Sequence, residues 1–478
     1  MYSKKLLSNF IWRLLERFGA QGVTFVVSIV LARLLDPSVY GTVALVTVFI
    51  TILQVFVVSG LGNALIQKRN SDDLDFSSVF YFNIVICIIL YVILFVIAGL
   101  IANFYGNTEL IPIIRVLGIN IIISGIKNIQ QAYVSKKLIF KKFFFSTLGG
   151  TVGAAIVGIL MAYHGYGVWA LVAQTLFNSL VDTIILWFTV GWRPKLMFSF
   201  KRLMGLLSYG WKLLVSSLID TGYNKLRELL IGKIYSAQDL AYYNRGNQLP
   251  SNLVISINTA IDSVLLPTMA EQQDELNKIK AMTRKAIKMS AYCIMPMMVG
   301  VSVCAKPIVS LLLTEKWIGC VPYLQIFCFT YAMYPIHTAN LNALKAIGRS
   351  DLFLKLEIIK KIVGLLLLFS TINLGALAMA FSCLLAGFIS QIINAWPNKK
   401  LLNYGFIEQM KDILPSISLS VIMGIFAYGV YAFNLSNIVT LIIQVIIGSS
   451  VYFLGSWILH FESFEYVRNI IRKSKKGE

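Results

Sequence analysis

The chain has 478 residues, of which 57% are hydrophobic and 13% are charged, and its mean hydropathy is +0.75. A composition this apolar excludes a soluble globular protein and indicates an integral membrane protein. The formal net charge of +20 suggests nucleic-acid binding at first sight. In a membrane protein, however, basic residues set the orientation in the bilayer, so we expect no nucleic-acid partner.

The apolar runs predict an all-α membrane protein. A bilayer core about 30 Å thick needs about 20 helical residues to cross it. The sequence contains fourteen apolar runs of suitable length. In chain order they cover residues 10–34, 41–66, 79–102, 111–131, 144–163, 167–190, 205–235, 241–266, 289–313, 321–344, 358–373, 375–397, 411–433 and 436–460.

The basic residues predict the orientation of these spans. If the N-terminus is cytoplasmic, the inner segments hold 30 of the 42 lysines and arginines, among them "SKKLIFKKF" and "GWRPKLMFSFKRL". Cytoplasmic loops carry an excess of basic residues. We therefore expect a multi-pass membrane protein with both termini in the cytoplasm.

Two stretches 200 residues apart predict an internal repeat. "LLSNFIWRLLERFGAQG" (residues 6–22) aligns without a gap with "LLSYGWKLLVSSLIDTG" (residues 206–222). Six predicted spans separate the copies, so both enter the membrane from the same side. This predicts a parallel repeat related by an axis along the membrane normal.

The repeat divides the chain into three predicted parts around a central cavity. Residues 1–200 form one six-helix bundle, residues 201–400 a second, and residues 401–478 two further helices with a basic cytoplasmic tail. Short joints at 36–41 and 236–241 occupy matching places in the two copies. We expect rocking of the bundles to expose the cavity alternately, with these joints closing its outer rim.

Charged side chains inside the predicted spans mark the candidate site. A charge in a transmembrane helix is costly and normally faces a partner or a water-filled cavity. The first, seventh and eighth spans carry such charges on polar helical stripes. The cations are Arg13, Arg17, Lys225, Arg227 and Arg245, and the acids are Glu16, Asp220, Glu228 and Asp262.

Explanations that involve no transport function stay open for several of these charges. Arg13 and Arg17 lie near the cytoplasmic end of their helix and can extend to the headgroups. Lys225 and Glu228 can simply neutralise each other. Arg245 has no acid three or four positions away on either side, which favours a role in a cavity. Asp182, an isolated acid, fits a protonated core residue or a counter-ion equally well.

The chain also resembles a known family of exporters. The stretches "LARLLDPSVYGTVALV" and "GLGNALIQKRNSDD", and later "GKIYSAQDLAYYNRGNQLP" and "SVLLPTMAEQQDE", are similar to Wzx-type polysaccharide and O-antigen flippases. These belong to the multidrug/oligosaccharidyl-lipid/polysaccharide (MOP) exporter superfamily, and the nearest branch is that of colanic and teichuronic acid export. The resemblance covers essentially the whole chain.

The resemblance implies a flippase for an undecaprenyl-pyrophosphate-linked oligosaccharide, located in the bacterial cytoplasmic (inner) membrane. In that case the five cations are expected to bind the pyrophosphate, with Arg13 and Arg17 receiving it from the inside and Lys225, Arg227 and Arg245 holding it nearer the outside. The four acids serve either as coupling sites for protons or sodium ions or as charge partners. A polysaccharide polymerase and glycosyltransferases are possible partners.

Two alternative functions fit the sequence less well. A membrane polysaccharide polymerase or ligase would display a sizeable outer loop, and none is predicted. A drug/cation antiporter of the same superfamily would have an acid-dominated cavity, whereas cations predominate here. No nucleotide-binding, nucleophile-elbow or zinc-protease pattern is present in the sequence, so we expect no enzymatic activity, no resident cofactor and no metal site.

Overall fold

The computed structural model describes the backbone of residues 2–466 and 468, and their side chains except at 2–11, 13–18, 209, 260 and 350. This part of the chain is helical throughout, without strands. It divides into two compact units, unit 1 (Met1–Ala241) and unit 2 (Tyr242–Glu478). The basic tail predicted at the C-terminus lies mostly outside the described residues. The boundaries at residues 200 and 400 stay a prediction.

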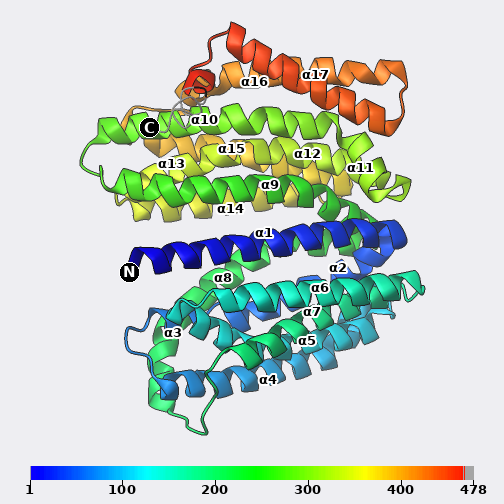
Figure 1. Cartoon of the computed structure of the whole chain (residues 1–478), viewed down its shortest axis with the longest axis vertical. Helices are drawn as coiled ribbons and strands as arrows, with labels where there is room; N and C mark the ends of the chain where they lie inside the picture. Colours follow the sequence, from blue (N-terminus) through cyan, green and yellow to red (C-terminus); the bar gives the residue numbers. More distant parts are fainter. Residues whose placement is uncertain (1, 467, 469–478) are drawn as a thin grey trace. The chain divides into compact units, whose positions relative to one another are not determined.

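Unit 1 contains the eight helices α1 to α8. Within it α1 packs on α6, α6 on α7, and α5 on both α4 and α7, as Figure 1 shows. The bounds are α1 Tyr2–Leu34, α2 Pro37–Val58, α3 Leu61–Gln67, α4 Asp73–Tyr105, α5 Leu110–Lys137, α6 Lys141–Tyr163, α7 Val168–Thr189 and α8 Phe200–Ile234.

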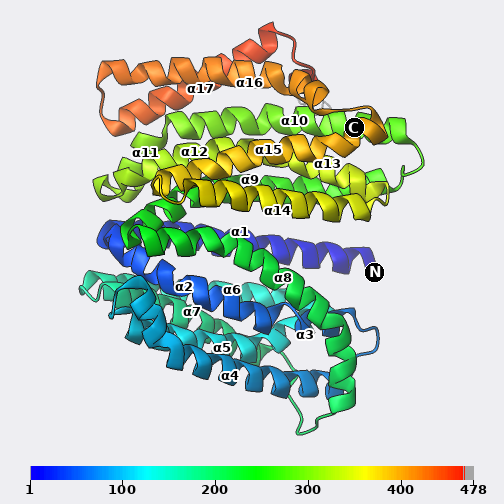
Figure 2. The ribbon, with the colours of Figure 1, turned by 180° about the vertical axis from the view of Figure 1, so that it is seen from behind.

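The helix α8 packs against other helices of unit 1, although in the sequence it begins the second copy of the repeat. It lies along α2, and its early turns lie beside α3 and α4 (Figure 2). The serine hydroxyls of α4 help to hold this end, because Ser78 accepts a hydrogen bond from the backbone N–H of Ser199 at 2.9 Å.

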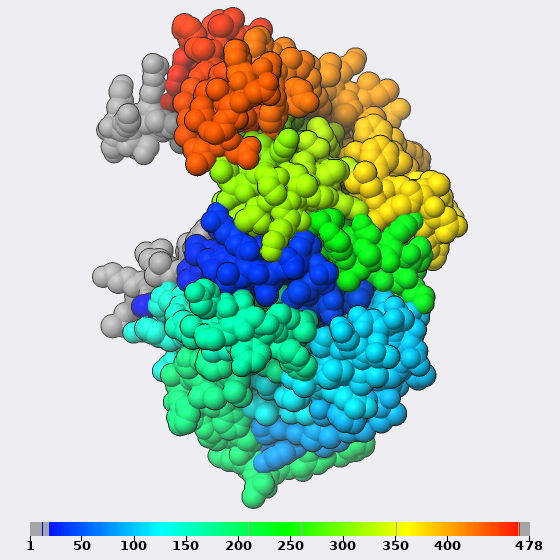
Figure 3. Space-filling view, turned by 90° about the vertical axis from the view of Figure 1, so that its right-hand side faces the viewer, coloured from blue at the N-terminus to red at the C-terminus, as the bar shows by residue number. Residues whose placement is uncertain are grey.

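Unit 2 contains the helices from most of α9 onwards. The long helix α10 packs on α16, which in turn packs on α17. In Figure 3 the orange atoms of the last helices lie against yellow-green atoms of the same unit. The bounds are α9 Ala237–Ala270, α10 Leu276–Val303, α11 Ala305–Leu313, η1 Glu315–Cys320, α12 Val321–Ala332, α13 Tyr334–Ala346, α14 Ser350–Thr371, α15 Ala376–Leu402, α16 Phe406–Gly429, η2 Val430–Phe433 and α17 Asn437–Ile458.

The helix α4 shows why these sequences form long helices. Asp72 and Asp75 form a reciprocal capping box at its start, with N–H to carboxylate distances of 3.0 and 3.2 Å. Most of the following 33 residues are apolar, and the helix ends at Tyr105, before Gly106, whose φ of 68° is left-handed. At 1.5 Å per residue, α4 is about 50 Å long and therefore spans a bilayer.

All fourteen predicted runs lie on helical segments, and the chain is an all-α integral membrane protein. In the described part, ten helical segments are long and apolar enough to cross a membrane. The polar helices α1 and α8 are not among the ten. Three predicted runs consist of two α-helices each. The break before α13 coincides with Pro335, which lacks the N–H that a continuous helix requires.

The two joints predicted from the repeat have the same local structure. The helix α1 ends at Leu34 and α2 begins at Pro37, whereas α8 ends at Ile234 and α9 begins at Ala237. Both joints therefore consist of two residues and are offset by 200 positions. Each second helix begins earlier than predicted, at 37 and 237 and not at 41 and 241. For α2 the reason is Pro37, which initiates the helix at its first helical position.

Candidate functional site

The polar residues of α8 form ion pairs and hydrogen bonds along their own helix. Lys225 Nζ lies 2.6 Å from Glu228 Oε1, and the two side chains are half-buried. One turn earlier, Asn224 donates a hydrogen bond of 3.3 Å to Asp220. Lys225 and Glu228 therefore neutralise each other, as their spacing of three residues allows. Arg227 is half-buried in the same turn of the helix.

Arg245, on α9 in unit 2, is held by an aromatic ring and an amide. Its guanidinium carbon lies 5.3 Å from the centroid of the Trp317 ring, and Trp317 is fully buried. Its Nη1 donates a hydrogen bond of 2.8 Å to Gln248 Oε1, three residues further along α9. Stacking on an indole orients a guanidinium. Arg245 is half-buried and therefore reachable from the solvent.

Asp262 has an amide partner on another helix of unit 2. Its Oδ1 accepts a hydrogen bond of 2.7 Å from Asn342 of α13. The predicted choice between a coupling acid and a charge partner stays open for Asp262, because an amide leaves the carboxylate charge in place.

The remaining three predicted residues cannot be placed in a site. Arg13, Glu16 and Arg17 belong to α1, but their side chains lie outside the described residues. Their roles stay predictions. The cations Lys225 and Arg227 belong to unit 1 and Arg245 to unit 2.

Asp182 is a counter-ion within unit 1. Its Oδ2 lies 3.1 Å from Lys127 Nζ, which joins α7 to α5. The sequence reasoning left the choice between a protonated core acid and a counter-ion open. It missed Lys127 as the partner, since the two residues are 55 positions apart on separate helices.

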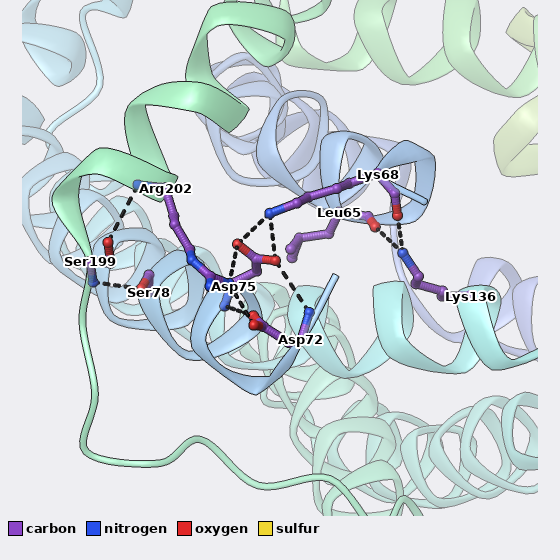
Figure 4. A network of polar contacts seen from close by, with 8 residues as sticks. All are labelled: Leu65, Lys68, Asp72, Asp75, Ser78, Lys136, Ser199 and Arg202. Atoms are coloured by element: carbon purple, nitrogen blue, oxygen red, sulfur yellow. Dashed lines mark hydrogen bonds and ion pairs between the residues drawn. The ribbon is translucent and has the colours of Figure 1, made fainter. Parts of the chain in front are cut away.

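A second group of charges lies where α3, α4 and α8 meet, and Figure 4 shows it from close by. The carboxylate of Asp75 is fully buried and lies 2.6 Å from Lys68 and 3.6 Å from Arg202. Arg202 also contacts Asp72 at 2.5 Å, and this guanidinium holds the pKa of the Asp72 carboxyl at about 2. Lys136 donates hydrogen bonds to the backbone carbonyls of Leu65 and Lys68.

This group, which we call the α3–α4–α8 charge cluster, borders a cavity. The cavity has a volume of about 320 Å³. Its lining residues are Ala64, Gln67, Lys68, Arg202, Gly205 and Leu206. The cluster was missed from the sequence because its members lie in loops and helix ends, where charges are usually solvated.

The two joints of the repeat contact each other within unit 1. Gly41 of α2 packs directly on the backbone of Ala237, and a Cβ added at Gly41 would lie 1.7 Å from the Ala237 carbonyl oxygen. Only glycine fits at this position. Closure of an outer rim by these joints stays a prediction, and this contact is the place where it can be tested.

A family described as "Polysaccharide biosynthesis protein" matches residues 30–322. The chain belongs to this family. It is 24% identical over 385 residues to the teichuronic acid biosynthesis protein TuaB of Bacillus subtilis (strain 168), covering 79% of each chain.

Two further similarities agree with the resemblance seen in the sequence, which is thereby confirmed. The chain is 22% identical over 397 residues to the lipopolysaccharide biosynthesis protein WzxC of Escherichia coli (strain K12), covering 82% of this chain and 79% of that one. Its fold is similar to that of the lipid II flippase MurJ in an inward closed conformation. The TM-score is 0.73 at 17% identity, and 98% of this chain and 99% of MurJ are covered.

Proposed function

We propose that the chain is a flippase that carries undecaprenyl-pyrophosphate-linked glycan units across the bacterial cytoplasmic membrane for polysaccharide export. The observation that carries this proposal is the family match over residues 30–322. The MurJ-like fold over nearly the whole chain supports it. Both termini lie in the cytoplasm in this proposal, in agreement with the excess of basic residues in the segments assigned to that side.

The charges fit an anionic, lipid-linked cargo. A pyrophosphate needs charge-assisted hydrogen bonds to replace water while its polyprenyl chain stays in lipid. Arg245, stacked on Trp317, presents a planar fork suited to phosphate oxygens. Arg227 in unit 1, with Arg13 and Arg17, would bind the same group at another stage of alternating access. Lys225 binds the pyrophosphate only when its ion pair with Glu228 opens.

The drug/cation antiporter alternative has less support from the described charges. Glu228 is neutralised by Lys225, and Asp182 by Lys127, both in unit 1. A cationic drug would also be repelled by the stacked guanidinium of Arg245. A polymerase partner and glycosyltransferases belong to the proposal as suppliers and consumers of the cargo.

Export in living cells tests this function. In a bacterial strain that lacks its own flippase for an undecaprenyl-linked repeat unit, the full chain is expected to restore surface polysaccharide when it accepts that unit. Lipid-linked repeat units extracted from the membrane should fall to the level of the parent strain. If surface polysaccharide does not return and the chain instead confers resistance to cationic drugs in a strain without any glycan pathway, the antiporter alternative replaces the proposal.

A further inference from the structure

The first turns of α8 lie in the headgroup layer of the membrane. The helix α4 has 33 residues and is about 50 Å long, whereas a bilayer with its headgroups is about 40–45 Å thick. The start of α4 therefore reaches the headgroups. The first turns of α8 run across this end of α4 and beside α3, as Figure 2 shows. They place Arg202 of the α3–α4–α8 charge cluster at the same depth.

These turns of α8 expose an apolar face. Phe200 and Met204, four residues apart on one side of the helix, are 62% and 42% exposed. Leu203 and Leu206, on the other side, are buried. A helix in the headgroup layer that combines exposed apolar side chains with cations is typical of segments whose apolar face lies in the acyl chains. The cavity that Arg202 borders therefore adjoins lipid.

Two cations form the polar wall of this cavity. Lys68 and Arg202 line it, and both side chains are partly exposed. The ion pairs of Arg202 with Asp72 and Asp75 both use Nη1. Within the described part of the chain, Nε and Nη2 of Arg202 donate no hydrogen bond to the protein. Two nitrogens of the guanidinium are thus available to an anion.

The cluster as a whole has more positive than negative groups. Its cations are Lys68, Lys136 and Arg202, and its acids are Asp72 and Asp75 (Figure 4). Lys136 donates its hydrogen bonds to two backbone carbonyls and not to an acid. A negatively charged ligand would complete the balance of charge.

The remaining wall of the cavity is apolar and leaves room. Ala64 and Leu206 line it, and a Cβ added at Gly205 would meet nothing within 4 Å. The volume of about 320 Å³ corresponds to about ten molecules of liquid water, which is ample for a phosphate group. Ion pairs that only hold α8 on α4 would explain the acids, but not this open space beside two cations.

We propose that this cavity binds the phosphate group of an anionic phospholipid such as phosphatidylglycerol. Arg202 donates to two phosphate oxygens through Nε and Nη2, and Lys68 adds a point charge. The glycerol part of the lipid lies against Ala64 and Leu206. The site lies in unit 1 and uses none of the residues assigned to the cargo, so it does not depend on the proposed function.

A phospholipid fits the cavity better than a soluble phosphate does. Both present the same oxygens to Lys68 and Arg202. Only the lipid also has acyl chains that can cover the exposed apolar face at Phe200 and Met204, and burial of apolar surface favours binding. The lipid therefore gains from both halves of the site.

Native mass spectrometry of the purified full chain, titrated with phospholipid, tests the site without any cargo. The unmodified protein is expected to retain phosphatidylglycerol at lower lipid concentration than phosphatidylcholine with the same acyl chains. Gly205→Leu fills the cavity, keeps every ion pair and favours the helix, so it should weaken phosphatidylglycerol binding by at least about tenfold. Gly205→Ala adds only one methyl group and should bind as the unmodified protein does.

A matched pair of double variants tests the role of charge. Arg202→Gln/Asp72→Asn removes both partners of one ion pair and should weaken phosphatidylglycerol binding by about tenfold, the effect of one lost charge-assisted hydrogen bond. Lys195→Gln/Asp73→Asn removes a neighbouring exposed pair that does not line the cavity, and should have no effect. Unchanged binding by Gly205→Leu or by Arg202→Gln/Asp72→Asn, or an equal loss in the Lys195→Gln/Asp73→Asn control, would overturn the proposal.

Competition with a soluble headgroup identifies the source of the phosphate. Glycerol 3-phosphate carries the same phosphate chemistry without acyl chains. At ten times the concentration of phosphatidylglycerol, it is expected to leave lipid binding unchanged. Displacement of the lipid by glycerol 3-phosphate or by inorganic phosphate would show that the cavity takes a soluble anion, and the assignment to a phospholipid would be wrong. No preference for phosphatidylglycerol over phosphatidylcholine in the unmodified protein would contradict it as well.

Discussion

Replacing Arg245 with alanine is expected to reduce polysaccharide export by at least about tenfold without lowering the amount of protein in the membrane. A charge-assisted hydrogen bond to a buried charged group contributes about 1.5–3 kcal/mol, and 1.4 kcal/mol corresponds to a factor of ten. Arg245→Lys keeps the charge but loses the planar fork, so it should retain an intermediate rate. Export is measured by surface polysaccharide in the complemented strain, with immunoblots of membranes.

Two control variants separate anion binding from local packing. Gln248→Ala removes the amide that accepts a hydrogen bond from Arg245 Nη1 and leaves the guanidinium on Trp317. It should reduce export only slightly. Lys306→Ala removes a cation from α11, away from the predicted stripes, and should have no effect. Normal export by Arg245→Ala at normal membrane levels would show that Arg245 serves only to pack on Trp317.

Replacing Gly41 with alanine is expected to abolish most export while leaving membrane insertion intact. The added methyl group would lie 1.7 Å from the backbone carbonyl of Ala237, which cannot move like a flexible side chain. The two joints would therefore be unable to meet, and one conformation of the transport cycle would be lost. Alanine stabilises helices relative to glycine, so α2 itself should not suffer.

Accessibility of the joints measures this effect directly. A cysteine at Ser236 in a cysteine-free version should react faster with a membrane-impermeant thiol reagent when Gly41→Ala is present. Gly99→Ala is the matched control, because a Cβ at Gly99 meets nothing within 4 Å. If Gly41→Ala exports at the unmodified rate and the cysteine reacts as before, the contact between the joints has no role in transport.

The helices were predictable from the sequence because the bilayer demands long apolar runs with basic residues on one side. The break at Pro335 was missed because an apolar run continues across it, and hydropathy does not register a missing N–H. The repeat offset of 200 residues placed the joint between α8 and α9 correctly. It did not place the helix starts at 37 and 237. The start of α2 depends on local initiation at Pro37.

The candidate site was predictable only within single helices. Lys225 and Glu228 are three residues apart, so helical geometry alone brings them together. Lys127 and Asp182 meet because α5 packs on α7, and the pairing of two largely apolar helices is not encoded in the period of either one. The same reason hid Arg202 and Asp75, which are brought together by the packing of α8 on α4.

Flipping by the purified full chain in proteoliposomes tests the central claim most directly. The cargo is a short undecaprenyl-pyrophosphate-linked oligosaccharide with a fluorescent sugar, and a membrane-impermeant quencher reports how much of it reaches the outer leaflet. The account predicts that the chain accelerates this movement and that Arg245→Ala slows it. It also predicts much slower movement of an uncharged polyprenyl-linked sugar that lacks the pyrophosphate. No acceleration over protein-free liposomes, or equal rates for the charged and uncharged lipids, would contradict a flippase that recognises its cargo through the pyrophosphate.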